Sequence, residues 1–230
     1  MLTLKSIRNT FFTTVLLFIV IPAVDGNSAN GYFAGIDKSS FNTHVKRFVR
    51  NYIQENYKNL YNIKKRSRHP FSIIDSVLKE NELPAQLKYL AVIESELKTK
   101  AVSQVGAAGL WQLMPKTARI LGLKVTDRRD ERTNAYKSSK AAALHLKYLH
   151  DQYGDWLLVF AAYNCGEVPV NDAIRQAGSK NFWKIQSELP AETREYVKKF
   201  IATCYYFEGM RSLTIVAAPN KSSTTKAVKS

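Results

Sequence analysis

The stretch from Glu82 to Leu97, ELPAQLKYLAVIESEL, places a carboxylate inside an apolar helical pattern. Four apolar residues share one face of this helix: Leu83, Leu87, Leu90 and Ala91. At about 100° per residue, Glu94 falls in the middle of that face and Glu96 falls on the far side. We therefore expect Glu94 to point into the interior or into a cleft, and Glu96 to be a solvated surface residue.

Burial disfavours the ionised form of a carboxyl group. The pattern therefore predicts a raised pKa for Glu94 and makes it a candidate general acid. The alternative is a structural glutamate that is hydrogen-bonded to backbone or paired with an arginine. Periodicity alone leaves both interpretations open.

The rest of the chain is also helical in pattern, and no alternating stretch is long enough to predict a strand. Proline, Asx and glycine residues mark the ends of the predicted helices: 41–63, 69–80, 82–97, 115–122, 134–154, 156–164, 168–178, 181–189 and 191–209. We expect Asp155 to cap a central buried helix, and the basic run KKRSR at 64–68 to be a solvated loop. The predicted fold class is mainly α, with at most a minor β element.

The N-terminus has the order of a secretory signal peptide. Lys5 and Arg8 precede an apolar run, which ends in the polar stretch DGNSAN. The run is shorter than the roughly 20 residues that a membrane-spanning helix needs, so we expect a signal over residues 1–26 and no stable membrane insertion after cleavage. An uncleaved anchor is the alternative. The predicted location is the periplasm or cell envelope.

The chain carries a net charge of +15 on 230 residues, with 45% apolar content, which is enough for one domain with a real core. Such a charge favours anionic partners, but export makes nucleic acid an unexpected one. We find no glycine-rich phosphate loop and no metal-spaced cluster, and so expect neither cofactor nor metal. Cys165 and Cys204 are expected to be two small buried thiols, with a bridge between them as the open alternative.

Four motifs in order resemble a known family: IES at 93–95, SQVGAAGLWQLMP at 103–115, AYNCG at 162–166 and ETREYV at 192–197. They are similar to those of the lytic transglycosylases with a soluble-lytic-transglycosylase (SLT) domain, closest to the membrane-bound murein transglycosylase D type. The resemblance covers about residues 41–207. It implies a lysozyme-like helical domain that acts on peptidoglycan glycan strands, with protein partners left unknown.

The activity implied by the resemblance is cleavage of the β-1,4 bond between N-acetylmuramic acid and N-acetylglucosamine without water, which leaves a 1,6-anhydro sugar. Glu94 would act first as general acid and then as base. The resemblance also implies a set of substrate-binding residues: Ser95, Ser103, Gln112, Tyr163, Asn164 and Tyr196. Trp111 stands where many members carry methionine, and we expect it to widen the contact with a sugar ring.

Together, composition and the resemblance predict four parts of the chain. They are the signal peptide at 1–26, an N-terminal helical segment at 32–80 that packs on the catalytic domain, the lysozyme-like transglycosylase domain at 81–209, and a basic, Ser/Thr-rich tail at 210–230 that we expect to be disordered.

Two other functions remain open. One is a lysozyme-type hydrolase, for which Asp127, Asp130 or Glu131 would supply a second carboxylate. The other is a catalytically inactive peptidoglycan-binding protein. Asp130 and Arg132 are more simply expected to form a loop-to-helix ion pair.

Overall fold

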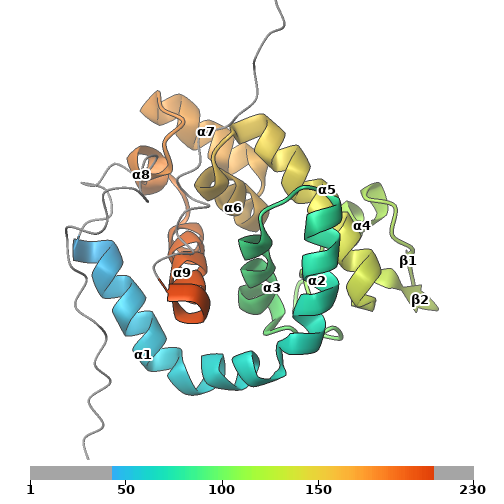
Figure 1. Cartoon of the computed structure of the whole chain (residues 1–230). Helices are drawn as coiled ribbons and strands as arrows, with labels where there is room; N and C mark the ends of the chain where they lie inside the picture. Colours follow the sequence, from blue (N-terminus) through green and yellow to red (C-terminus); the bar gives the residue numbers. More distant parts are fainter. Residues whose placement is uncertain (1–42, 210–230) are drawn as a thin grey trace, which may run out of the picture. The chain divides into compact units, whose positions relative to one another are not determined.

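Helices dominate the computed structural model, which describes residues 43–209 (Figure 1). All of these residues belong to one unit of the chain, residues 31–230. The first half contains α1 (Thr43–Arg66), α2 (Arg68–Glu80), η2 (Ala85–Leu87), α3 (Lys88–Ser95), α4 (Pro115–Ile120), β1 (Val125–Thr126) and β2 (Arg129–Asp130). The second half contains η3 (Glu131–Thr133), α5 (Ala135–Tyr153), α6 (Trp156–Cys165), α7 (Glu167–Ala177), α8 (Phe182–Ile185), η4 (Gln186–Glu188) and α9 (Ala191–Glu208).

The predicted fold class, mainly α with a minor β element, is confirmed. The β element is one short antiparallel hairpin, in which Val125 pairs with Asp130 and Thr126 with Arg129. Within residues 43–209, no helix combines the length and the apolar character that crossing a bilayer requires. The predicted signal peptide and tail, at 1–26 and 210–230, lie outside the described residues, as does the start of the N-terminal segment.

Several helix ends follow from local capping, as the sequence predicts. The Asn134 side chain accepts a hydrogen bond from the Lys137 amide (2.9 Å), and α5 ends at Gly154 in the left-handed region. The Asp155 carboxylate accepts one from the Leu157 amide (2.7 Å) at the start of α6. These caps satisfy amides that a helix leaves without an internal partner.

The basic run at 64–68 is not the loop that we expected. Helix α1 continues through Arg66, and Ser67 alone separates it from α2. Lysine and arginine are good helix formers and are favoured in the last turn, where they face the negative end of the helix dipole. A tertiary contact adds to this, because the Arg66 guanidinium donates to the Glu96 carbonyl (3.0 Å).

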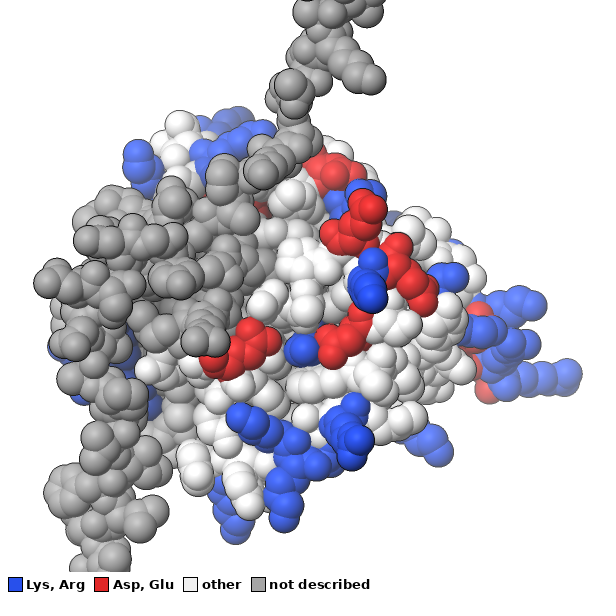
Figure 2. Space-filling view, in the orientation of Figure 1, with Lys and Arg blue, Asp and Glu red and all other residues white. Residues whose placement is uncertain are grey.

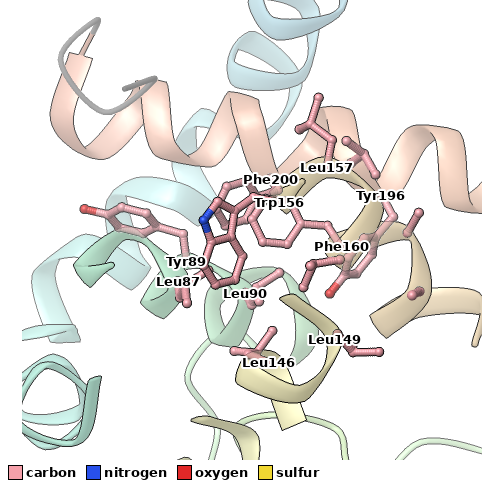
Figure 3. Packing of buried hydrophobic residues seen from close by; sticks show 14 of the residues in the cluster. Leu87, Tyr89, Leu90, Leu146, Leu149, Trp156, Leu157, Phe160, Tyr196 and Phe200 are labelled. Atoms are coloured by element: carbon pink, nitrogen blue, oxygen red, sulfur yellow. The ribbon is translucent and has the colours of Figure 1, made fainter. Parts of the chain in front are cut away.

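The core is built around α6, which is buried on all sides from Trp156 to Ala162. Figure 3 shows side chains from α9, α6, η2, α3 and α5 meeting in one apolar layer. Phe160 of α6 lies against Phe200 of α9, with 4.0 Å between the ring centroids. Leu87 and Leu90, which share the face of Glu94, are fully buried in this layer. The core therefore fixes the helix that carries Glu94.

The first and last described helices pack together. Helix α1 lies along α9, α3 also packs on α9, and α2 packs on α5, so that α1 and α2 form an arc around α3 (Figure 1). Val45 and Ile63 of α1 are buried in the same apolar cluster as the central helices. The division of the chain between a segment ending at 80 and a domain starting at 81 remains a prediction.

The Arg132 side chain is hydrogen-bonded to the loop between α3 and α4. It is buried, and one guanidinium nitrogen donates to the carbonyls of Gly106 (2.7 Å) and Leu113 (2.9 Å). The same guanidinium pairs with Asp130 at 2.6 Å, which confirms the expected ion pair. One cation thus neutralises Asp130 and satisfies two carbonyls of the loop.

Gly109 lets this loop approach the Arg132 backbone. Its φ is +83°, and an added Cβ would lie 1.9 Å from the Arg132 carbonyl oxygen. Gly106 has nearly the same φ, +84°, but an added Cβ there would meet nothing within 4 Å. The two glycines therefore separate the cost of the left-handed backbone from the cost of close packing.

We expect Gly106→Ala to lower the free energy of unfolding by about 1–2 kcal/mol, the cost of placing a Cβ in the left-handed region. Gly109→Ala should cost at least about 3 kcal/mol more, because backbone must move to relieve the overlap. Urea unfolding of both variants measures the difference. Equal decreases in the free energy of unfolding would show that the backbone near Arg132 can move to accommodate the added Cβ at no cost in stability.

Candidate active site

Glu94 lies in the last turn of α3, opposite α9. Its carboxylate oxygen accepts a hydrogen bond from the Tyr196 hydroxyl at 2.6 Å. The side chain is half-buried, so a ligand can still reach part of it. Burial raises the pKa of Glu94 to about 7, and the charge of nearby Glu192 adds to the rise, while the Tyr196 hydrogen bond opposes it. This agrees with the raised pKa expected from the sequence.

Tyr163 belongs to the same group of side chains. It comes from the end of α6, and its hydroxyl donates to the Trp111 carbonyl (2.7 Å). Burial, and then the charge of Glu94, raise the pKa of Tyr163 and also that of Tyr196. Because Glu94 acts on both phenols, helices α3, α6 and α9 bring three ionisable groups together.

Asn164, the next residue, joins α6 to the start of α9. Its side-chain oxygen accepts a hydrogen bond from the hydroxyl of Thr193, a buried residue of α9 (2.8 Å). This use of the oxygen leaves the amide nitrogen of Asn164 as a donor.

Ser95 is buried, and its hydroxyl lies within hydrogen-bonding distance of the carbonyls of Ala91 (3.1 Å) and Leu110 (2.9 Å). The second contact ties the end of α3 to the loop that carries Gln112. The sugar contact implied for Ser95 stays a prediction, while the geometry gives its hydroxyl a structural use.

Gln112 has a left-handed backbone, with φ of +45°, which is unusual for a residue other than glycine. Its amide nitrogen donates to the carbonyls of Gly109 (3.0 Å) and Ala101 (3.3 Å), so its amide oxygen remains as an acceptor. Ser103 lies at the other side of this loop, where its hydroxyl accepts from the Ala107 amide (3.0 Å). This contact gives Ser103 a structural use in the loop, and its implied sugar contact stays a prediction.

Trp111 does not provide the sugar contact that we expected. Its side chain is fully buried, and its indole nitrogen donates to the Ser139 hydroxyl of α5 (2.9 Å). A buried indole N–H needs a hydrogen-bond acceptor, and the Ser139 hydroxyl provides one in the interior. The Trp111 side chain therefore fixes the loop to α5, and its backbone carbonyl accepts the hydrogen bond from Tyr163.

Three residues that support the site were not predicted from the sequence to act there. Glu192 raises the pKa of Glu94, Thr193 binds Asn164, and Arg132 holds the loop. The spacing of Glu192 and Tyr196 carries a signal for the first, since residues four apart share a helix face. No comparable local signal exists for Arg132, whose acceptors are spread along the chain.

The carboxylates considered for a second catalytic role are engaged elsewhere. Glu131 is buried and binds Lys137 (2.6 Å) and Arg129 (2.7 Å). The hydrogen bond from Lys137, and then that from the Lys124 amide, lower its pKa to about 2. Arg132 lowers the pKa of Asp130. Asp127 is exposed in the turn between β1 and β2. The described site thus supplies one carboxyl group poised near neutrality.

The two cysteines are not joined by a disulfide. Cys165 and Cys204 are free thiols; Cys204 is buried as expected, but Cys165 is only half-buried. Across residues 43–209, no three His, Cys, Asp or Glu side chains gather in a way that could hold a metal ion.

Two curated relatives share part of the sequence. The chain is 39% identical over 130 residues to the membrane-bound lytic murein transglycosylase D of Escherichia coli (strain K12), which covers 54% of this chain and 28% of that protein. It is 33% identical over 135 residues to a putative tributyltin chloride resistance protein of Alteromonas sp. (strain M-1), covering 58% and 65%. The chain therefore spans less than a third of the first relative.

The fold resembles that of a solved structure, the 70 kDa soluble lytic transglycosylase of Escherichia coli. The TM-score is 0.57 at 23% identity, over 76% of this chain and 32% of that one. The Transglycosylase SLT domain model matches residues 71–186, half of the chain, and this range contains Glu94, Gln112 and Asn164 but ends before α9. On this match, the chain belongs to the Transglycosylase SLT domain family.

Proposed function

We propose that this protein is a peptidoglycan lytic transglycosylase. It cleaves the β-1,4 bond between N-acetylmuramic acid and N-acetylglucosamine without water and leaves 1,6-anhydromuramic acid ends. The observation that carries the proposal is the half-buried Glu94 carboxyl, with a pKa of about 7 and a hydrogen bond from Tyr196. Family membership and the relatives named as murein transglycosylases support the substrate.

A carboxyl group with this pKa can serve twice in one reaction. In its protonated form Glu94 donates to the glycosidic oxygen as the bond to the muramyl C1 breaks. As a carboxylate it then removes the proton from the 6-hydroxyl, which closes on C1. An acid that later acts as base works best when its pKa lies near the working pH. The Tyr196 hydroxyl stabilises the intermediate carboxylate state.

The polar groups around Glu94 suit a glycan. The free amide oxygen of Gln112 accepts from sugar hydroxyls or N-acetyl N–H groups, and the Asn164 nitrogen donates to sugar oxygens. Ser103 and Tyr163 complete the proposed contacts. We assign Ser95 a positioning role, because its hydroxyl holds the Gln112 loop against α3.

Digestion of purified peptidoglycan, followed by mass spectrometry of the fragments, tests the proposal. A transglycosylase gives anhydro ends, a lysozyme-type hydrolase gives reducing ends, and an inactive binding protein gives no fragments. The pairing of Asp130 and Glu131 with basic residues favours the first outcome over the second. Action in the periplasm or cell envelope, after export, is part of the same proposal.

We expect Glu94→Gln to lower turnover by at least about 10²–10⁴-fold, the usual contribution of a general acid. The change keeps the shape of the side chain and removes the titrating proton. Glu96→Gln is the matched control, since the Glu96 carboxylate binds Lys98 (2.8 Å) and Asn59 (3.1 Å), and not Tyr196. The rate of fragment release from peptidoglycan measures the turnover of both variants. A comparable loss of turnover in the two would show that Glu94 is not the general acid.

The pH profile should have an alkaline limb near pH 7, because activity needs the protonated acid. Tyr196→Phe removes a hydrogen bond that lowers the pKa of Glu94, so the limb should move to higher pH while the rate falls. Glu192→Gln removes a charge that raises this pKa, so the limb should move to lower pH. Shifts in the same direction, or none, would show that another group sets the limb.

Stability supplies a test that is independent of turnover. The folded-state pKa of Glu94, about 7, lies above the ordinary 4.5, so the stabilisation from its bound proton is complete below pH 4.5 and is lost as pH rises through 7. Glu94→Gln keeps the neutral form at every pH. It should be more stable than the wild type by up to about 3 kcal/mol at pH 8 and by less than about 1 kcal/mol at pH 5. Denaturant unfolding at the two pH values measures this, and a constant difference would argue against a buried ionising carboxyl.

A further inference from the structure

A cavity of about 600 Å³ lies between α1, α3 and α9, and we call it the α1 cavity. None of the candidate site residues lines it, although two of its lining residues, Ile93 and Glu195, directly precede Glu94 and Tyr196 in the sequence. Successive helical residues point about 100° apart. The α1 cavity therefore shares helices with the candidate active site but opens on another face of them.

The floor of the α1 cavity is apolar and one wall is aromatic. Leu60, Ile63 and Val92 are buried beneath it. Phe48 and Tyr52 stack on each other, with ring centroids 6.1 Å apart and planes within 8°. Lys198 already lies over the Phe48 ring at 5.9 Å, which shows that this wall attracts a cation. Such a surface suits a methylene chain that ends in a positive charge.

The polar groups of the cavity are mostly hydrogen-bond acceptors. The side-chain nitrogen of Asn56 donates to the Tyr52 carbonyl (2.9 Å), and that of Asn59 donates to Glu96 (3.1 Å). Both amides therefore keep their oxygens for a ligand. Asn51 lies on the same wall.

Carboxylates outnumber cations in the lining, in a chain whose net charge is +15. Glu55, Glu96 and Glu195 line the cavity, against Lys199 alone. Figure 2 shows that the acidic side chains of the visible face lie mostly across its middle, with several basic ones among them, while the lower edge is basic.

These carboxylates differ in how far they are already neutralised. Glu96 is neutralised by Lys98 and Arg66, and Glu195 has only a long contact to Lys199, 3.9 Å. Glu55 forms no ion pair or side-chain hydrogen bond with any residue of 43–209. Glu55 and Glu195 are thus open to an incoming cation.

We propose that the α1 cavity binds a short peptide through a primary ammonium group on a lysine-like side chain. The methylene chain lies on the apolar floor beside Phe48 and Tyr52, and the ammonium group binds Glu55 and Glu195 and the asparagine oxygens. If the proposed function holds, the natural source is the amine-bearing peptide attached to the glycan. The cavity then recognises the peptide part of the polymer that the Glu94 site cleaves.

The test uses the full chain and a tetrapeptide with one lysine, whose N-terminus is acetylated so that the ε-ammonium group is its one positive charge. The comparison peptide carries an acetyl group on that amine. Calorimetry at 0.15 M salt should show the free amine binding about tenfold to a hundredfold more tightly, the usual gain from a hydrogen bond to a charged group. Equal binding of the two peptides, or none, overturns the proposal.

Two matched variants locate the bound peptide. Glu55→Gln should weaken binding of the free amine by about tenfold or more and leave the acetylated peptide unchanged. Glu80→Gln makes the same charge change at an exposed site at the end of α2, outside the cavity, and should leave both unchanged. If both variants weaken binding of the free amine equally, the peptide responds only to the net charge of the protein, and the proposal is overturned.

Glu94→Gln separates this proposal from the proposed function. It should abolish glycan cleavage and leave peptide binding intact. Loss of peptide binding in that variant would place the peptide at Glu94 and overturn the α1 cavity proposal. If the wild type binds the peptide but yields no glycan fragments, the proposed transglycosylase activity fails while the cavity assignment stands.

Discussion

The constraint on which the arrangement depends is the burial of one carboxyl group, that of Glu94, against the apolar face of α3. Desolvation of its charged form works against folding at neutral pH, and the Tyr196 hydroxyl returns only part of that cost. The surrounding helices hold the group in place because Leu87 and Leu90 fix α3 in the core and Phe160 and Phe200 fix α9. A site with an unfavourable buried charge is therefore held by helices whose apolar side chains are fully buried in the core.

The loop between α3 and α4 is held in place by hydrogen bonds from several parts of the chain. It contains little regular structure, yet its backbone is held by Arg132 below, by Ser95 on α3, by Tyr163 on α6 and, through Trp111, by Ser139 on α5. Four parts of the chain thus position one short segment, and this over-determination is what can maintain the left-handed backbone of Gln112. These hydrogen bonds add to apolar packing, since Leu110, Trp111 and Leu113 of the loop are buried in the core.

What could be predicted from the sequence was local. The burial of Leu87, Leu90 and Ala91 on the face of Glu94, the end of α5 at Gly154 and the cap at Asp155 depend on residues within one or two turns of each other, and each was correct. Leu83 is the exception, because it precedes the helix. The other failures were at positions set by distant contacts. The indole of Trp111 turns inward because Ser139 accepts from it, and α1 continues through Arg66, which reaches the Glu96 carbonyl. Glu96 is partly exposed, as expected of a surface residue, and a distant contact that the sequence did not predict joins it to Asn59 of α1.

The pairing of α1 with α9 has a consequence for the way the chain reaches its fold. These helices are the first and last of the described part, so their contact joins segments separated by more than a hundred residues. Contacts at such separation are slow to form, since the entropy of closing the intervening chain must be overcome first. During synthesis, the side of α1 that packs on α9 lacks this partner until α9 has emerged from the ribosome. The α1–α9 contact is therefore a late step in folding, and a chain that has not yet made it exposes apolar surface that can aggregate.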